Sequence, residues 1–244
     1  MRRVTEGLND PPSDVAVGSG RAGRPADTKE SRMATIVVFG GTGYTGGNIV
    51  REAASRGHHV ISVSRSEPTE PIEGVTYDTG TVEDLAPRLI PGADAVVAAL
   101  SPRGDMAGRL VDIYRELARL CAEAGARYLQ IGGFSSLRPA PGAPRFAEGE
   151  IPEQFRDEAL EGEATRAMLV AEATGDLDWL FISPAGSYGA WAAGERTGEY
   201  RVGDEVALFD EAGESAISGA DLALAVLDEI DTPAHHRTHI GIAN

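Results

Sequence analysis

Short apolar runs alternate with amphipathic segments along the chain from about residue 33 to its end. Six of the runs predict strands, at residues 35–40, 59–64, 74–78, 94–100, 127–132 and 178–183. The first run, TIVVFG, is apolar throughout, which is typical of a central parallel strand covered on both faces.

The amphipathic segments predict helices at about residues 44–56, 108–124 and 161–174. Gly57, Gly125 and Gly175 follow them, and glycine often ends a helix in the left-handed conformation. Strands that alternate with helices predict an α/β fold of Rossmann type. Its sheet is doubly wound and parallel, with helices on both faces and strand order 3-2-1-4-5-6.

The pattern changes after Pro184. Residues 196–201 and 206–209 predict a small hairpin around Gly203-Asp204, residues 220–230 a helix and residues 238–243 a last strand. We expect this part to form a small C-terminal add-on over the carboxyl-terminal edge of the sheet. Residues 1–32 are rich in Gly, Pro, Ser, Asp and Arg without apolar periodicity, and predict a disordered tail before a single domain over 33–244.

A glycine-rich turn with the spacing Gly40-x-x-Gly43-x-x-Gly46 follows the first predicted strand and opens a helix. In that context the spacing is typical of dinucleotide-binding sites, whose phosphates meet the N–H groups and positive dipole end of the helix. Gly40 permits the tight turn, Gly43 the approach of a pyrophosphate, and Gly46 close packing. The alternative is a loop that only makes a turn. The other residues expected to bind the cofactor here are Thr42, Tyr44 and Thr45.

The end of the second predicted strand indicates which dinucleotide binds. An acidic residue there favours NAD, because it accepts a hydrogen bond from the ribose 2′-hydroxyl. This chain has Ser64 and Arg65 instead, and a guanidinium pairs well with a 2′-phosphate, so we expect NADP(H) to be preferred over NAD(H). The alternative is a solvated surface arginine. Asp78, followed by Thr79, either accepts from the adenine amino group or caps the next helix.

Small and polar residues end the fourth, fifth and sixth predicted strands. In an open α/β sheet the carboxyl ends of the strands meet at one ligand-binding crevice. Here they would lie beside the nicotinamide half of the cofactor. The strand-end residues expected to contact it are Ala99, Leu100, Ser101, Gly132, Gly133 and Pro184, with Ser135 and Ser136 close by.

The composition excludes several other functions. A net charge of −16 disfavours nucleic acid and anionic membranes as partners, and no run of apolar residues is long enough to span a bilayer. The single cysteine, Cys121, fits a reducing cytoplasm and an inert position inside a helix. We expect His235, His236 and His239 to be surface turn residues, and no metal site.

Six segments resemble the atypical short-chain dehydrogenase/reductases that bind NAD(P)H, in particular the bacterial proteins related to NADH-flavin reductases. They are GGTGYTG at 40–46, GGFSSL at 132–137, DWLFISPAG at 178–186, ERTGEYRVG at 195–203, SAIS at 215–218 and TPAHHR at 232–237. The resemblance covers residues 35–244. Relatives include biliverdin-IXβ/flavin reductases, whose arginine after the second strand maps onto Arg65 and whose serine after the fifth maps onto Ser135, and NmrA-like redox-sensing regulators.

The lysine count limits the chemistry. Conventional short-chain dehydrogenases use a Tyr-x-x-x-Lys pair as proton donor, but the only lysine here is Lys29. A flavin or quinone stabilises the developing charge itself, so the residues favour an NADPH-dependent reductase with such an acceptor, in which Ser135 orients the ring or the acceptor. Phe134, Tyr188 and Trp191 are candidate stacking walls, with ordinary packing as the alternative. A non-catalytic sensor of NADP(H) remains the second hypothesis.

Overall fold

The computed structural model describes residues 33–173 and 175–244, so the predicted disordered tail, 1–32, lies outside the described residues. Within this part, eight strands form one sheet in the order β3-β2-β1-β4-β5-β6-β8-β7. The strands are β1 (Thr35–Phe39), β2 (His59–Ser64), β3 (Thr76–Thr79), β4 (Ala95–Ala98), β5 (Arg127–Ile131), β6 (Trp179–Pro184), β7 (Arg201–Gly203) and β8 (Thr238–Ala243).

The predicted α/β Rossmann fold and its strand order are confirmed. β1 pairs in parallel with both β2 and β4, so the direction of winding reverses between β1 and β4. β8 continues the parallel sheet beside β6, and only β7, at the edge, runs antiparallel to its neighbour. The last strand therefore belongs to the main sheet. Ligands of open α/β sheets bind at such a reversal point.

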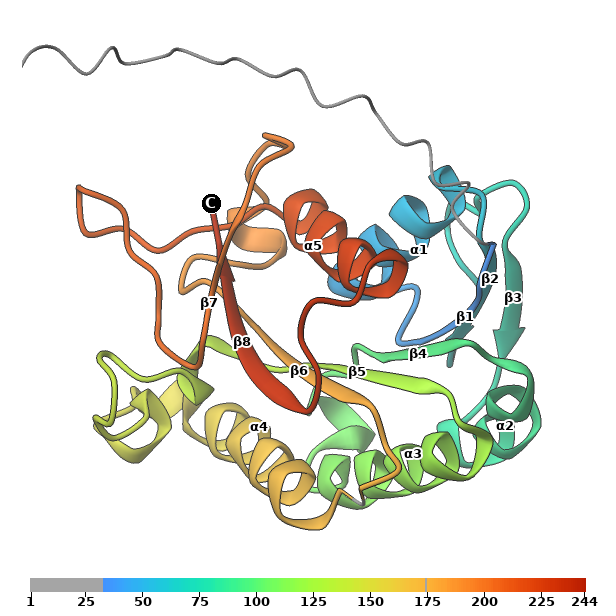
Figure 1. The fold of residues 1–244 in the computed structure, drawn as a ribbon, viewed down its shortest axis with the longest axis horizontal. Coiled ribbons are helices and arrows are strands. Elements are labelled where there is room, and N and C mark those ends of the chain that lie inside the picture. The colour runs from blue at the N-terminus through green and yellow to red at the C-terminus, as the bar shows by residue number, and fades with distance from the viewer. Residues whose placement is uncertain (1–32, 174) are drawn as a thin grey trace, which may run out of the picture. The chain divides into compact units, whose positions relative to one another are not determined.

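Helices cover both faces of the sheet, as Figure 1 shows. The five α-helices of the described residues are α1 (Tyr44–Ser55), α2 (Val82–Leu89), α3 (Leu110–Ala124), α4 (Glu153–Glu172) and α5 (Gly219–Asp231). α1 and α5 pack on one face, and α2, α3 and α4 on the other. β1 serves both layers, because Ile36 and Val38 join the first core and Val37 and Phe39 join the second. This explains its apolar sequence.

α4 begins at Glu153, eight positions before the predicted start at residue 161. The early turns were missed because residues 153–158 are all exposed and carry no apolar periodicity. Contacts to the segment after β4 hold them instead: Glu158 pairs with Arg103, and Glu161 accepts from the backbone N–H of Gly108. Within the described ranges, no helix has the length and apolar character needed to cross a membrane.

The hairpin predicted around Gly203-Asp204 is wrong. Arg201–Gly203 pairs antiparallel with β8, and Val206 makes only an isolated bridge to Arg138. The free edge of β8 is the pairing partner of the first strand of the predicted hairpin, and the local sequence pattern gives no sign of it. Residues 196–201 are held by side chains of α1 and α5 and form no ladder with residues 206–209.

Candidate dinucleotide-binding site

The turn after β1 requires glycine at two positions for different reasons. Gly40 has φ +85°, a conformation that other residues rarely adopt. A Cβ on Gly46 would lie 2.2 Å from the carbonyl oxygen of Gly40, so α1 starts in direct contact with the turn. Backbone N–H groups of Gly40 and Gly41 both donate to the Val63 carbonyl, which fixes the turn against the end of β2. The predicted tight, closely packed turn is present.

The amino terminus of α1 is open to a phosphate. Its N-cap is Gly43, exposed and without a side chain to cap the helix, and the first turn contains no acidic residue. Two predicted side chains are already engaged: the Tyr44 hydroxyl accepts from Gly219 N and donates to the Ala193 carbonyl, and Thr45 Oγ1 lies 2.8 Å from the Tyr188 hydroxyl. These residues therefore present backbone N–H groups to the crevice, while their side chains fasten α1 to the C-terminal part.

The turn meets the end of β4 at the reversal point. Ala99 N donates to the Phe39 carbonyl at 2.9 Å, and a Cβ on Gly40 would lie 2.4 Å from the Ala99 carbonyl oxygen. The buried Tyr114 hydroxyl contacts both the N–H and the carbonyl of Leu100, at 3.2 Å each. The backbone at this point is thus held in place, and Ser101 follows it as an exposed residue.

The ends of β2 and β3 lie side by side. Ser64 Oγ donates to the Ser66 carbonyl, and the Ser64 carbonyl accepts from Gly80 N. Asp78 pairs with Val63 in the sheet register and is half-buried.

The alternative that Asp78 caps the next helix is wrong, because Thr81 caps α2 by accepting from Asp84 N. Thr79 Oγ1 donates to Glu67 at 2.8 Å, so its hydroxyl already has a partner.

Arg65 is exposed but not simply solvated. Its guanidinium forms an ion pair with Asp105, which lies in the segment between β4 and α3. The two side chains are 59% and 65% exposed. Sequence reasoning missed Asp105, since nothing local to it signals a partner forty positions away.

The end of β5 carries the two serines. Residues Phe134–Ser136 form a single 3-10 turn, in which Ser135 is half-buried and Ser136 is fully buried. The Ser136 Oγ has no hydrogen-bond partner among the described residues. The geometry favours Ser135 over Ser136 as a ligand contact. A Cβ on Gly132 would lie 2.2 Å from the Phe181 ring, so packing alone requires that glycine.

A buried polar network supports this turn from behind. Arg145 donates to the Ser136 carbonyl and pairs with Glu205, and its Nη1 lies 3.4 Å from Nδ1 of His239. Because arginine only donates, Nδ1 accepts and the Nε2–H donates to Ser183 Oγ at 2.9 Å. The Ser183 hydroxyl then donates to the Gly133 carbonyl at 2.9 Å.

Burial, followed by the charges of Arg145 and Arg166, lowers the pKa of His239 to about 3, so its ring is neutral in the folded protein.

Two of the three predicted stacking aromatics have packing partners. Phe134 stacks on Phe146 with ring centroids 4.7 Å apart, and Tyr188 meets Tyr44 edge-on. Trp191 is 78% exposed. Ordinary packing thus accounts for Phe134 and Tyr188, whereas Trp191 is exposed.

The comparisons with known proteins identify the family of the chain. Residues 40–233 match the model of the family described as NAD(P)H-binding. The chain belongs to the NAD(P)H-binding family. YwnB of Bacillus subtilis, an uncharacterized protein, is 31% identical over 204 residues, which cover 82% of this chain and 93% of YwnB. The resemblance to atypical short-chain dehydrogenase/reductases is confirmed.

Two solved structures share the fold of this family member. A "putative NADH-flavin reductase" from Streptococcus pneumoniae superposes with a TM-score of 0.74 at 27% identity, over 86% of this chain and 99% of its own. A "putative epimerase" from Bacteroides thetaiotaomicron gives 0.76 at 31% identity, over 87% and 97%. The names differ in reaction, and both match nearly the whole domain described here.

The histidine prediction needs correction. His239 is buried in β8, as part of the network behind Ser135, because alternation along β8 turns its side chain into the sheet layer. His235 and His236 pair with Glu229 and Asp178 at the opposite end of the sheet. Among residues 33–173 and 175–244, no three His, Cys, Asp or Glu side chains gather as a metal-binding group.

Cys121 is buried in α3 as predicted, and burial raises the pKa of its thiol to about 12.

The segment 195–198, to which the sequence assigns no chemistry, is anchored on Asp221. That fully buried carboxylate accepts from the backbone N–H groups of Thr197 and Gly198 and from the Ser218 hydroxyl. Burial alone would raise the pKa of Asp221, but these hydrogen bonds outweigh it and lower the pKa. Arg196 adds an ion pair with Glu52 of α1. The family member thus ties this segment to both helices of one layer.

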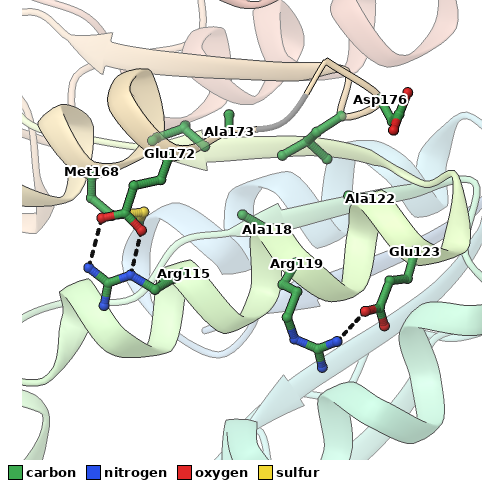
Figure 2. A pocket seen from close by; sticks show the side chains of 11 residues that line it. Arg115, Ala118, Arg119, Ala122, Glu123, Met168, Glu172, Ala173 and Asp176 are labelled. Atoms are coloured by element: carbon green, nitrogen blue, oxygen red, sulfur yellow. Dashed lines mark hydrogen bonds and ion pairs between the residues drawn. The ribbon is translucent and has the colours of Figure 1, made fainter.

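A cavity of about 460 Å³ lies between α3 and α4, away from the crevice (Figure 2). Its floor includes Ala118 and Met168, and ion pairs of Arg115 with Glu172 and of Arg119 with Glu123 border it. The helix ends that form it lead into the amino ends of β5 and β6, so it opens at the edge of the sheet opposite the glycine turn.

Proposed function

We propose that the chain is an NADPH-dependent reductase that passes a hydride to a flavin or quinone-type acceptor. The observation that carries this proposal is a shared position: an uncapped helix terminus at Gly43, an arginine just after β2, and an aromatic-lined turn after β5 all lie at the carboxyl edge of the sheet. Family membership and the name of the Streptococcus pneumoniae structure support a nicotinamide-dependent reduction.

The chain's own residues fit a dinucleotide. A Cβ on Gly43 would meet only one atom of the protein, the Gly40 carbonyl oxygen at 3.2 Å. The space beside Gly43 therefore has room for a pyrophosphate. The N–H groups of the first turn of α1 would hold the phosphates, as at other helix amino termini. Arg65 would pair with the 2′-phosphate, and this is our reason for preferring NADPH.

Three tyrosines of the described residues are poorly suited to act as a general acid. Tyr114 and Tyr128 are fully buried, and burial raises the pKa of both phenols. Tyr188 is bonded to Thr45, and burial raises its pKa as well. The single lysine of the chain, Lys29, lies before β1. A conventional carbonyl reduction would lack its proton donor, whereas a reduced flavin or quinone can take its proton from water.

The acceptor would lie over the turn after β5. Bound NADPH would supply a hydride from its nicotinamide ring to the acceptor, with the proton coming from water. Ser135 would orient the ring or the acceptor through its hydroxyl. Trp191 would cover the acceptor, and the packed pair Phe134–Phe146 would give the site a rigid aromatic wall.

The test follows NADPH oxidation by the purified full chain with FMN as acceptor. We expect turnover above the rate without protein, and an Arg65→Ala variant should raise the KM for NADPH about tenfold, as expected for losing one charge-assisted contact to phosphate. Arg119→Ala, which removes an exposed arginine on α3, is the matched control and should leave the KM unchanged. Tight NADPH binding without turnover on several flavins and quinones would contradict the reductase.

A sensor of the NADP/NADPH ratio is the second candidate, and the missing acid–base pair favours it as well. A ligand shifts a conformational equilibrium only through differential affinity. A sensor must therefore bind NADP⁺ and NADPH with clearly different dissociation constants. Equal constants for the two forms, measured by calorimetry, would exclude this role.

A further inference from the structure

Two segments that are far apart in the sequence meet at the adenosine end of the crevice. Arg65 follows β2, and Asp105 lies in the β4–α3 loop, residues 101–109; the two side chains form an ion pair. Both are more than half exposed, so the pair lies at the surface where a ribose phosphate could reach it.

The β4–α3 loop is held in this position from two sides. On one side Arg103 pairs with both oxygens of Glu158 of α4, and on the other Arg109 pairs with Glu83 of α2. Gly104, which precedes Asp105, has φ +63°, a turn that other residues rarely make. The loop therefore places Asp105 against Arg65 by its own geometry, and the Arg65–Asp105 pair is only one of its attachments.

The ion pair brings together two groups with different ligand preferences: a guanidinium, which binds a phosphate, and a carboxylate, which accepts from a hydroxyl. In NAD-specific Rossmann sites, an acid at the end of the second strand accepts a hydrogen bond from the ribose 2′-hydroxyl. This chain has Ser64 and Arg65 there, but Asp105 brings a carboxylate to the same place from the β4–α3 loop.

We propose that Asp105 sets the cofactor selectivity of the crevice. With NADH its carboxylate stays on Arg65 and accepts from the 2′-hydroxyl; with NADPH the 2′-phosphate replaces it on Arg65. This inference rests on the proposed function, in which Arg65 holds the 2′-phosphate.

The exchange needs little energy. An exposed ion pair contributes only about 0.2–1 kcal/mol, and a phosphate carries more charge and more acceptor oxygens than a carboxylate. The displaced Asp105 remains near the phosphate and repels it. Asp105 thus weakens NADPH binding and strengthens NADH binding, so the site accepts both cofactors with a moderate preference for NADPH.

The test measures dissociation constants of NADPH and NADH by calorimetry, without any acceptor. Asp105→Asn should lower the dissociation constant of NADPH about threefold and raise that of NADH about threefold, the range expected for exposed charge interactions. Arg65→Ala should weaken the binding of NADPH alone. When Arg65→Ala and Asp105→Asn are combined, the two cofactors should bind with almost equal dissociation constants. Opposite signs for the two cofactors in one variant are the signature of the proposal.

Glu83→Gln is the matched control, since it removes one negative charge and loosens the same loop without touching Arg65. If Asp105→Asn changes the two dissociation constants only as much as Glu83→Gln does, or changes both in the same direction, the proposed role of Asp105 is wrong. If Arg65→Ala weakens both cofactors equally, the failure lies in the proposed function. Melting temperatures of all variants identify any that fail to fold.

Discussion

The two halves of the crevice are held by ion pairs of different kinds. At the adenosine half, Arg65 and Asp105 are exposed on loops. At the acceptor half, Arg145 is 4% exposed and lies inside a network with His239 and Ser183. The exposed pair can exchange its partners for a ligand, whereas the buried network has no solvent to replace a lost partner.

This difference matches the task of each half. In the proposed reductase, the adenosine half distinguishes two cofactors that differ by one phosphate, and an exchangeable ion pair does so at low cost. The acceptor half would hold Ser135 at a fixed distance from the reacting rings. The network achieves this by fixing the carbonyls of Gly133 and Ser136, the residues on either side of the Phe134-Ser135 pair.

The largest effect should come from the buried half. Arg145→Met leaves the buried Ser136 carbonyl without this donor and leaves Glu205 with Arg138 alone, so we expect a loss of about 3 kcal/mol in the free energy of unfolding. Arg103→Met removes an arginine whose pair with Glu158 is exposed, and should lose less than about 1 kcal/mol. Urea denaturation measures both. Equal losses would remove the distinction between the two halves.

The next effect concerns the turn that joins the halves. Gly46→Ala forces a Cβ against the Gly40 carbonyl, and we expect about 1–3 kcal/mol of destabilisation with at least tenfold weaker binding of both cofactors. Gly47→Ala is the matched control, because its Cβ would meet the Gly41 carbonyl at an ordinary 3.6 Å. Calorimetric titration compares them, and unchanged affinity in Gly46→Ala would contradict the assignment of this turn.

His239 makes the stability of the fold depend on pH. Its pKa is about 3 in the folded protein against 6.5 for an unperturbed histidine, so below pH 6.5 the unfolded chain binds a proton that the folded chain does not. Stability should therefore fall by up to about 1.4 kcal/mol per pH unit as the pH drops from 6.5 towards 3. Burial of the ring is the main cause of this low pKa; the charges of Arg145, Arg166 and Arg138 lower it further, and Glu205 opposes them.

The matching variant is His239→Gln, which should lose this part of the acid sensitivity while the carboxylates continue to titrate. Unfolding free energies at several pH values between 4 and 7, chosen to bracket the unperturbed histidine pKa of about 6.5, measure the difference in slope. Identical slopes in the two proteins would show that His239 is already charged in the folded state.

The smallest effect is expected at the two serines. Ser135→Ala should lower kcat for NADPH oxidation about fivefold, a loss of roughly 1 kcal/mol typical of one neutral hydrogen bond. Ser136→Ala removes a buried hydroxyl that has no partner in the described part of the chain and should leave kcat unchanged. The reverse order of effects would assign the ligand contact to Ser136.

Local patterns predicted most of the fold and the glycine turn. The apolar runs identify β1 and β2, and the spacing of Gly40, Gly43 and Gly46 identifies the tight turn before α1, because each depends on residues that are close in sequence. The pattern failed where structure depends on distant partners. The exposed start of α4 has no apolar period, and β7 forms only because the edge of β8 is available.

The same limit applies to the candidate site. Arg65 could be predicted from its place after β2, but not its partner Asp105. His239 was grouped with the turn residues His235 and His236 although it lies in the predicted strand 238–243, and the pairing of that strand with β6 explains why it is buried. Arg145 lies in a Pro- and Gly-rich loop whose sequence gives no sign of a buried charge.

The most direct test of the proposed reductase is a single-turnover experiment without oxygen. The full chain, saturated with NADPH, is mixed with FMN, and the loss of the oxidised flavin's absorbance is followed. We expect a rate that exceeds the reaction without protein, saturates with flavin and falls in Ser135→Ala. A flavin absorbance that decays no faster with the NADPH-saturated protein than without it would contradict hydride transfer at this crevice.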